Sequence, residues 1–389
     1  MSNYISSNAN RFYAAVEATY GQAAAITAGN RFPAVRLQAH QALASGRRMD
    51  KTGSRTFRGA PASSRRQTVF EVRSYLTSWG GSGQPSYGPL FQAGLGAAPR
   101  LAAGLVVALS TSSTQMQMTV PHGLAIGSAI SFGAEIRFVT AIPDPRTVVV
   151  NAPFSNAAPA NSNLAPAVTF NLATSLSSLS IYDYWDPITA VSRLLTGAAV
   201  DSVQISVNGD FHEFAFRGPA ADLLDSTSFT SGTAGLSALP AEPILSGFDY
   251  SIVPGHLGQV WLGSTVDQFL TLTSAKIEVK NNIGVRGQEF GSPIPLAIAP
   301  GPREVVSDFT LLAQDDAQTT ALYAAAKQRT AISAMLQLGQ QQGSLMGIYI
   351  PSVTPEIPAY NDSESRLVWD FHGNLAKGNN NDEIYVAFA

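Results

Sequence analysis

Alternation of apolar and polar residues, interrupted by turn residues, is the feature that most constrains this chain. The segment DSVQISVNGDFHEFAFRG (201–218) places apolar residues at every second position on both sides of Asn208-Gly209. A period of two residues is typical of a half-buried strand, and Asn-Gly between two such runs is a strong signal for a β-hairpin. The segment therefore predicts two antiparallel strands joined by a turn.

The same alternation recurs along the chain. It is found in RQTVFEVRSYL (66–76), KIEVK (276–280), SLMGIYIPS (344–352), SRLVWDFHG (365–373) and NDEIYVAFA (381–389). Clusters of Gly, Pro and Asn separate these runs, as is usual between strands. We expect a mainly β fold, a β-sandwich or half-barrel, with one or two flanking helices. In KIEVK, Ile277 and Val279 are expected to face the core.

One helix is well specified by the sequence. In QDDAQTTALYAAAKQRT (314–330), Asp315 is placed to cap a helix over 315–329, and Gln318 follows three residues later as in a capping box. Lys327 and Arg329 in the last turn match the helix dipole. A face of small residues is expected to lie on a sheet, made of Ala317, Ala321, Leu322 and Ala325.

Two weaker helices are predicted over 9–21 and 186–197. Residues 80–100 are rich in Gly, Pro and Ser and indicate a linker or long loop. Short strands and turns then follow as a separate unit. We therefore expect a discontinuous main domain, 1–98 and 173–389, with a small β insertion domain at 99–172 that faces outward.

Charge is scarce and unevenly distributed. Charged residues make up 13% of the chain, where about 25% is usual for a soluble domain. Either much of the surface contacts other protein, or uncharged polar residues coat it. Residues 1–80 carry eleven Lys and Arg and three acidic residues, a net charge of +8, whereas the remainder carries −11. No aromatic residues alternate with these arginines as a base-stacking surface requires, so we favour a contact between copies of the chain over a nucleic acid site.

The sequence offers little catalytic chemistry, and we expect no enzyme activity, metal or cofactor. There is no cysteine, no two of the five histidines lie within four residues of each other, and G-x-S-x-G and Walker motifs are absent. The start, MSNYISSNANRFYAAVEATYG, lacks the basic region followed by an apolar run that is typical of a secretory signal, and no stretch approaches 18 uninterrupted apolar residues, so we expect no membrane-spanning segment. A glycoside-acting enzyme would need a pair of carboxylates, with Glu213 and Asp370 as the residues to test.

The order of several segments along the chain resembles that of the tail tube (major tail) proteins of long-tailed bacteriophages. The similarity covers about 1–80 and 170–389, and it is carried by VEATYG, DKTGSRTFRG, TVFEVRSYL, SVNGDFHEFAFRG, VPGHLGQVWLG, AKIEVKNNIGVRGQEFG, GPREVVSDFTL, GIYIPSV and DEIYVAFA. The resemblance implies a structural subunit with a β-sandwich or half-barrel fold, whose sheet closes with those of other copies into a barrel ring of six subunits.

Stacked rings would form a virion tail tube, assembled in the host cytoplasm, whose lumen conducts the genome. The implied partners are further copies of the chain, the tape measure, tail terminator and distal tail proteins, and DNA in transit, with no membrane. The family also implies a long loop that reaches the next ring, expected here near RTFRGAPASSRRQ (55–67).

We predict that two segments make the contacts between copies. Both consist of polar or charged residues next to glycines. They are Arg55, Arg58, Arg65 and Arg66 in the loop, and Lys276, Glu278, Lys280, Asn281, Asn282, Arg286 and Glu289 in KIEVKNNIGVRGQEFG (276–291). Asn281-Asn282 are expected to release the strand into a loop, because both residues tolerate positive φ.

A second hypothesis is a β-sandwich adhesin or carbohydrate-binding module. Its platform would be Trp185, in the aromatic stretch IYDYWD (181–186), or Trp261. Aromatic rings are suited to this role because one face is flat and apolar while their edges reach polar partners.

Overall fold

The computed structural model describes residues 4–46, 49–57, 59, 64–79, 83–245, 247, 248, 250–263, 268–363 and 365–389. The chain is mainly β, as predicted, with two α-helices, α1 (Gly88–Leu95) and α2 (Ala317–Gln328), and two short 3₁₀ turns, η1 (Ala28–Asn30) and η2 (Thr233–Gly235). Neither α-helix in the described residues has the length and apolar character that a membrane crossing requires.

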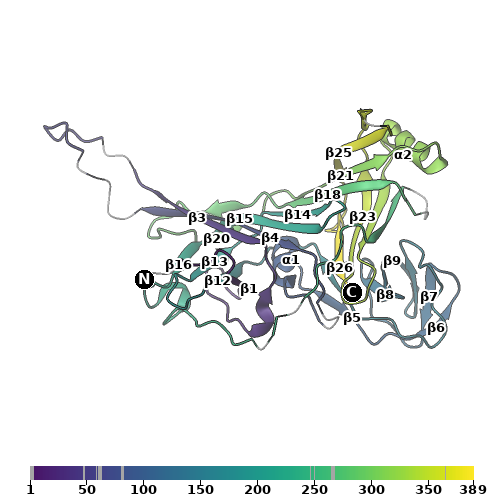
Figure 1. Cartoon of the computed structure of the whole chain (residues 1–389), viewed down its shortest axis with the longest axis horizontal. Helices are drawn as coiled ribbons and strands as arrows, with labels where there is room; N and C mark the ends of the chain where they lie inside the picture. Colours follow the sequence, from purple (N-terminus) through teal and green to yellow (C-terminus); the bar gives the residue numbers. More distant parts are fainter. Residues whose placement is uncertain are drawn as a thin grey trace.

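A 14-stranded antiparallel sheet dominates the molecule (Figure 1). Its main path runs, in spatial order, through β3 (Arg36–Ala44), β4 (Arg65–Tyr75), β15 (His212–Ala220), β14 (Ser202–Val207), β18 (Leu272–Lys280), β21 (Glu304–Leu312), β25 (Val368–Ala376), β23 (Met346–Thr354), β26 (Tyr385–Phe388), β11 (Ala167–Asn171) and β5 (Arg100–Ala102). Three strands pair beside this path, β22 (Ile332–Leu338), β17 (Gly258–Gly263) and β24 (Ala359–Asn361).

A smaller five-stranded sheet lies below the large one in Figure 1. Its spatial order is β16 (Asp222–Asp225), β13 (Arg193–Ala198), β12 (Leu179–Tyr184), β1 (Arg11–Val16) and β2 (Arg31–Phe32). The two sheets bury one shared hydrophobic core, so the described chain is a sandwich. A further two-stranded ribbon consists of β19 (Gly284–Arg286) and β20 (Ala297–Ala299).

The large sheet curls around helix α1, which gives it a half-barrel form. Phe91 of α1 contacts Phe214 and Phe216 of β15, and also Phe170 of β11 and Phe388 of β26, with ring centroids 5.1–6.1 Å apart. Strands that lie far apart in the sheet therefore meet on one aromatic side chain. Burying large aromatic rings removes much apolar area from water, which favours the curled form over a flat sheet.

Residues between β5 and β11 form a separate five-stranded sheet with its own core. The strands, in spatial order, are β6 (Val107–Ser110), β7 (Gln115–Met118), β10 (Thr147–Val150), β9 (Glu135–Asp144) and β8 (Ala129–Phe132). Both flanking strands, β5 and β11, pair with each other in the large sheet. The small sheet of this insertion is thus joined to the main body at two adjacent strands.

The predicted alternating strands are present. Phe70 and Val72 of β4 and Ile277 and Val279 of β18 are buried, whereas the residues between them are half-buried on the opposite face. The predicted hairpin is β14–β15, in which Val207 pairs with His212, and the connection is four residues long. Its turn is stabilised by Asn208, whose Oδ1 accepts hydrogen bonds from the backbone N–H groups of Asp210 and Phe211. The three predicted C-terminal strands correspond to β23, β25 and β26.

Two predicted helices are strands. The 9–21 segment contains β1, and the 186–197 segment contains most of β13. Both strands are central in the smaller sheet and are buried on both faces, so their sequences are nearly continuous apolar runs. Such runs lack the alternation that distinguishes a strand from a buried helix.

The prediction of a linker or long loop over 80–100 is wrong, because this segment contains helix α1. Seven of the eight α1 residues are buried. Pro89 suits the first turn of a helix, where a backbone N–H has no helical partner. A Cβ on Gly94 would lie 2.2 Å from a Val203 methyl carbon, so the glycine content permits close packing against the sheet.

Helix α2 is confirmed, but its cap is Asp316 and not Asp315. The Asp316 side chain accepts a hydrogen bond of 2.7 Å from the Thr319 backbone N–H. The buried residues are Thr319, Leu322 and Ala326, so the packed face differs from the expected one, which included the exposed Ala317 and Ala321. Successive residues lie about 100° apart around a helix, so Thr319 and Ala326 lie on the side opposite Ala317 and Ala321.

Candidate assembly surface

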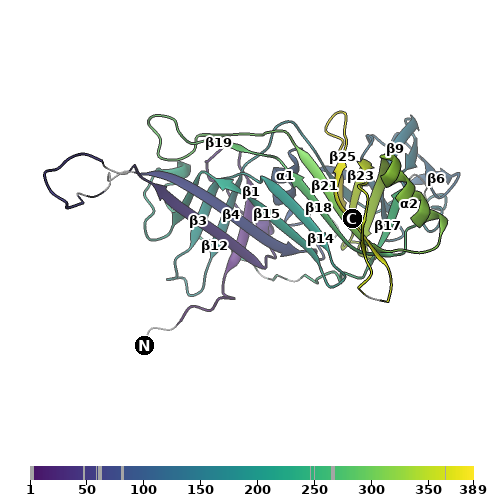
Figure 2. The same cartoon turned by 90° about the horizontal axis from the view of Figure 1, so that it is seen from above.

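Strands β3 and β4 extend away from the body as a hairpin arm, and the described residues 49–57 lie at its tip (Figures 1 and 2). Within its described part, Arg55 is exposed, and Met49 and Phe57 expose 84% and 69% of their surface. Gly53 has a φ of +71°, a backbone conformation that residues other than glycine rarely adopt. The arm thus presents both a cation and large apolar side chains to solvent. Arg58 lies outside the described residues.

Arg65 and Arg66, at the base of the arm, are engaged within the chain. Arg65 donates from its two terminal nitrogens to the carbonyls of Gly287 and Gln288, at 3.2 and 2.9 Å. Arg66 forms an ion pair of 2.6 Å with the buried carboxylate of Asp222. The two segments singled out from the sequence, the arm and the 276–291 stretch, therefore lie side by side. Each of these arginines has a structural role in fixing the arm to the body.

Lys276, Glu278 and Lys280 form a half-buried stripe on the outer face of β18. In register, Lys276 lies opposite Asp308 and Lys280 lies opposite Glu304 of the neighbouring strand β21. The ammonium of Lys276 is also 3.6 Å from the Glu278 carboxylate. Opposite charges in facing positions stabilise neighbouring strands. The stripe is consequently close to neutral over a few residues.

Asn281 corrects an expectation, because it is an internal residue. It is 2% exposed, and its Nδ2 donates to the carbonyls of Gly94 and Val200, both at 2.9 Å. Gly94 lies in the last turn of α1, where carbonyls lack helical partners. Asn281 thus caps a buried helix end, and its side chain is not available to a second copy of the chain.

Asn282 and the loop that follows are exposed. Asn282 has a φ of +49° and donates to the Pro302 carbonyl at 2.7 Å, so it ends the strand as expected for a residue that tolerates positive φ. Arg286 and Glu289 form an exposed ion pair with each other. Any contact that either of them makes with another copy has to compete with this pairing.

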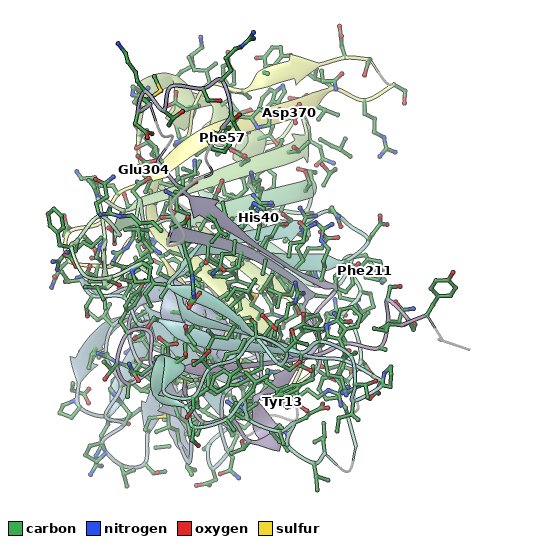
Figure 3. The ribbon with its side chains drawn as sticks, turned by 90° about the vertical axis from the view of Figure 1, so that its left-hand side faces the viewer. Tyr13, His40, Phe57, Phe211, Glu304 and Asp370 are labelled. Carbon is green, nitrogen blue, oxygen red and sulfur yellow. The ribbon has the colours of Figure 1, made fainter. Side chains whose placement is uncertain are left out.

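The outer face of the large sheet is polar and is not covered by another layer. Figure 2 shows β3, β4, β15, β14, β18 and β21 from above with this face toward the viewer. Figure 3 places Glu304 and Asp370 on the upper side of the molecule and Tyr13 of the smaller sheet below it. The face is therefore open to solvent or to a partner in the described chain.

Glu71 organises the charges at the β3 end of this face. Its carboxylate binds the guanidinium groups of Arg73 and Arg217 and lies 3.8 Å from that of Arg36. Partial burial opposes ionisation of this carboxyl, but the hydrogen bonds from Arg73 and Arg217 outweigh it and lower the pKa of Glu71. One carboxylate thus holds three cations of three neighbouring strands.

A groove of about 940 Å³ lies beside this cluster, along β3. It is lined by residues of β3, β4 and β15, and also by Arg193, Asp201, Ile283 and Val285. Strand β3 ends the sheet and is hydrogen-bonded to β4 alone among the described strands. An unpaired strand edge is a ready template for pairing with another chain.

The catalytic alternative receives no support from geometry. Glu213 lies on β15 and Asp370 on β25, with three strands between them. Four strand spacings correspond to roughly 19 Å, beyond the ~5–10 Å that a glycosidase pair spans. The described residues also contain no group of three or more His, Asp or Glu side chains arranged to hold a metal ion.

The two tryptophans proposed as sugar platforms differ. Trp261 is 6% exposed and is covered by Arg137, so it is not a platform. Trp185 lines a cavity of about 680 Å³ beside the smaller sheet. The sequence reasoning did not identify Arg137, which is fully buried between the insertion and the large sheet. An arginine within the apolar run of EIRFV (135–139) is the signal that could have revealed it.

Comparison of the sequence with protein-family models and with curated proteins finds no match.

Proposed function

We propose that this protein is the structural subunit of a bacteriophage tail tube, which polymerises into stacked rings, hexameric in the resembling family, and forms the conduit for genome ejection. The observation that carries the proposal is the combination of an open edge strand, β3, with a hairpin arm that extends from the same edge. The resemblance in segment order described above points to the same class of protein.

The open edge supports ring formation. A curled sheet with free edges can be completed by the sheets of other copies, which removes the exposed edges. The contact would be heterologous, since β3 would meet a different strand of its neighbour. Heterologous contacts generate closed rings when the rotation closes, and filaments when it does not.

The arm supports stacking of the rings. It combines the exposed Arg55 with the exposed apolar side chains of Met49 and Phe57, and the rest of the chain carries a net negative charge. An arm of this kind is suited to insertion into an acidic and partly apolar surface of the next copy. Complementary charges set the register of such contacts.

The stripe on β18 is assigned to a contact between copies within this proposal. The two lysines of the stripe lie beside acidic residues of the same face, so the stripe has little net attraction for the phosphates of DNA. A tube reconstruction in which Lys276 and Glu278 line the bore would contradict this assignment. In the tube, the further partners would be the tape measure, tail terminator and distal tail proteins.

The test is electron microscopy of the purified full chain, together with sedimentation to measure assembly. Rings or tubes are expected from the wild type, and the charge reversal Arg55→Glu is expected to reduce their yield without changing the melting temperature. Arg146→Glu, an exposed arginine on the insertion, is the matched control and should assemble normally. A wild-type chain that stays monomeric at high concentration, or intact tubes from Arg55→Glu, would count against the proposal.

A further inference from the structure

A cavity of about 680 Å³ lies at the end of the smaller sheet, away from the outer face of the large sheet. Its walls come from the start of β1, from the end of β12 with the following residues up to 192, and from the segment 226–242. This volume is within the range of about 300–1,000 Å³ that is usual for small-molecule sites. The proposed assembly surface does not use it.

An ion-pair network forms the polar wall of this cavity. Arg11 donates to Glu242 at 2.7 Å from Nε and to Asp186 at 2.6 Å. The Tyr13 hydroxyl donates to the same Glu242 carboxylate at 2.9 Å. Tyr13 lies on the side of the molecule opposite the outer face of the large sheet (Figure 3). Each carboxylate is thus held in a fixed position at the cavity.

Aromatic side chains form the other wall. Trp185 and Phe229 are half-buried at the cavity, and Tyr184 is held between Tyr182, with nearly parallel rings, and Tyr13, with an edge-to-face contact. These contacts restrict the ring orientations, so little rotamer entropy is lost when a ligand packs on them.

The chemistry of these walls selects a class of ligand. Two carboxylates face one guanidinium, so a phosphate, sulfate or other anion would be repelled. A purely apolar ligand would cover the exposed carboxylate of Asp186, which would keep only its contact with Arg11, and the exposed hydroxyls of Ser231 and Ser237. These groups would lose water without gaining a hydrogen-bond partner. A ligand with many hydroxyl groups and an apolar ring face matches both walls.

We propose that this cavity binds a neutral oligosaccharide, with Trp185 packing on a sugar ring and Asp186 and Glu242 accepting hydrogen bonds from sugar hydroxyls. The site would give the protein a glycan-binding function in addition to assembly. It is independent of the tube proposal, because the cavity belongs to a single copy of the chain.

The test is titration of the full chain with neutral tetrasaccharides of glucose, mannose and N-acetylglucosamine, followed by calorimetry and tryptophan fluorescence. Saturable binding of at least one of them is expected. Trp185→Ala should weaken it by about tenfold or more, as for other buried aromatic anchors. Trp369→Ala, which removes a tryptophan from the α2 side of the molecule, should leave the affinity unchanged.

Ser237→Trp provides a second variant, because Ser237 is exposed and its replacement fills the cavity without disturbing the core. It should abolish binding while circular dichroism shows a folded protein. Absence of saturable binding for every neutral tetrasaccharide would overturn the proposal. Binding that survives both Trp185→Ala and Ser237→Trp, or tighter binding of choline or a sulfated sugar, would overturn it as well.

Discussion

The guanidinium of Arg137 lies 4.2 Å from the centroid of the Trp261 ring. Arg137 belongs to β9 of the insertion, whereas Trp261 belongs to β17 of the large sheet. The same guanidinium donates to Gln337 and Gln259 and forms an ion pair of 3.4 Å with Glu135. A fully buried cation therefore holds the insertion against the main body, and the stacked pair Phe138–Tyr349 packs beside it.

Replacing Arg137 is expected to loosen this attachment. Arg137→Met keeps much of the side-chain volume but removes the donor to Gln259 and to the Pro153 carbonyl and the cation beside Glu135, while the Oε1 of Gln337 keeps only its hydrogen bond from the Ile136 N–H. We expect a loss of about 2–4 kcal/mol in the free energy of unfolding, measured by urea denaturation. Arg146→Met at an exposed position of the same insertion is the control and should change it by less than about 0.5 kcal/mol. Equal stability of the two variants would show that the Arg137 contacts contribute nothing to the free energy of unfolding.

Asn281→Ala should destabilise the protein through helix α1. The substitution leaves two buried carbonyls, of Gly94 and Val200, unpaired, at a cost of about 3 kcal/mol. The neighbouring Asn282→Gly is a matched control, because Asn282 is exposed at a φ of +49° that glycine adopts readily. Thermal unfolding should show a large decrease in melting temperature for the first variant and almost none for the second.

The cap of α2 can be tested with adjacent aspartates. Asp316→Ala removes the hydrogen bond to the Thr319 N–H and should lower the free energy of unfolding by about 1 kcal/mol. Asp315→Ala, one residue earlier at an exposed position, should have little effect. A larger loss of stability for Asp315→Ala than for Asp316→Ala in denaturant titrations would show instead that Asp315 is the capping residue, as the sequence pattern suggested.

His212 should make stability depend on pH. Its burial, only partly offset by a contact with the Leu257 carbonyl, lowers its pKa from 6.5 to about 4. Between these values the unfolded state binds more protons than the folded state, so stability falls as the pH decreases from 6.5 to 4. The loss attributable to His212 is about 3 kcal/mol. His212→Leu should remove this component, and the difference between wild type and variant at pH 7 and pH 4.5 measures it. A constant difference would contradict the expectation.

Strands with one buried face could be predicted from the sequence, whereas β1 and β13, which are buried on both faces, could not. Strands β23 and β26 are also buried on both faces over most of their length, but the Gly, Pro and Asn clusters beside them marked them as strands. In β4 and β18 the alternation is local, because each side chain faces either the core or the outer surface. In β1 and β13 both faces are covered, so the burial pattern carries no period. Helix α1 was missed for a related reason, since a helix enclosed on all sides has no polar face.

The sequence by itself determined the mainly β character, the hairpin at Asn208-Gly209, the C-terminal strands and the presence of α2. These follow from side-chain periodicity and turn chemistry over a few residues. Only the tertiary structure decided which polar residues are internal and which face outward. Asn281 meets Gly94 across 187 residues, Arg65 meets Gly287 across 222, and Arg11 meets Glu242 across 231. Local patterns carry no information about such partners, because the partner is brought close only when the sheets curl and pack.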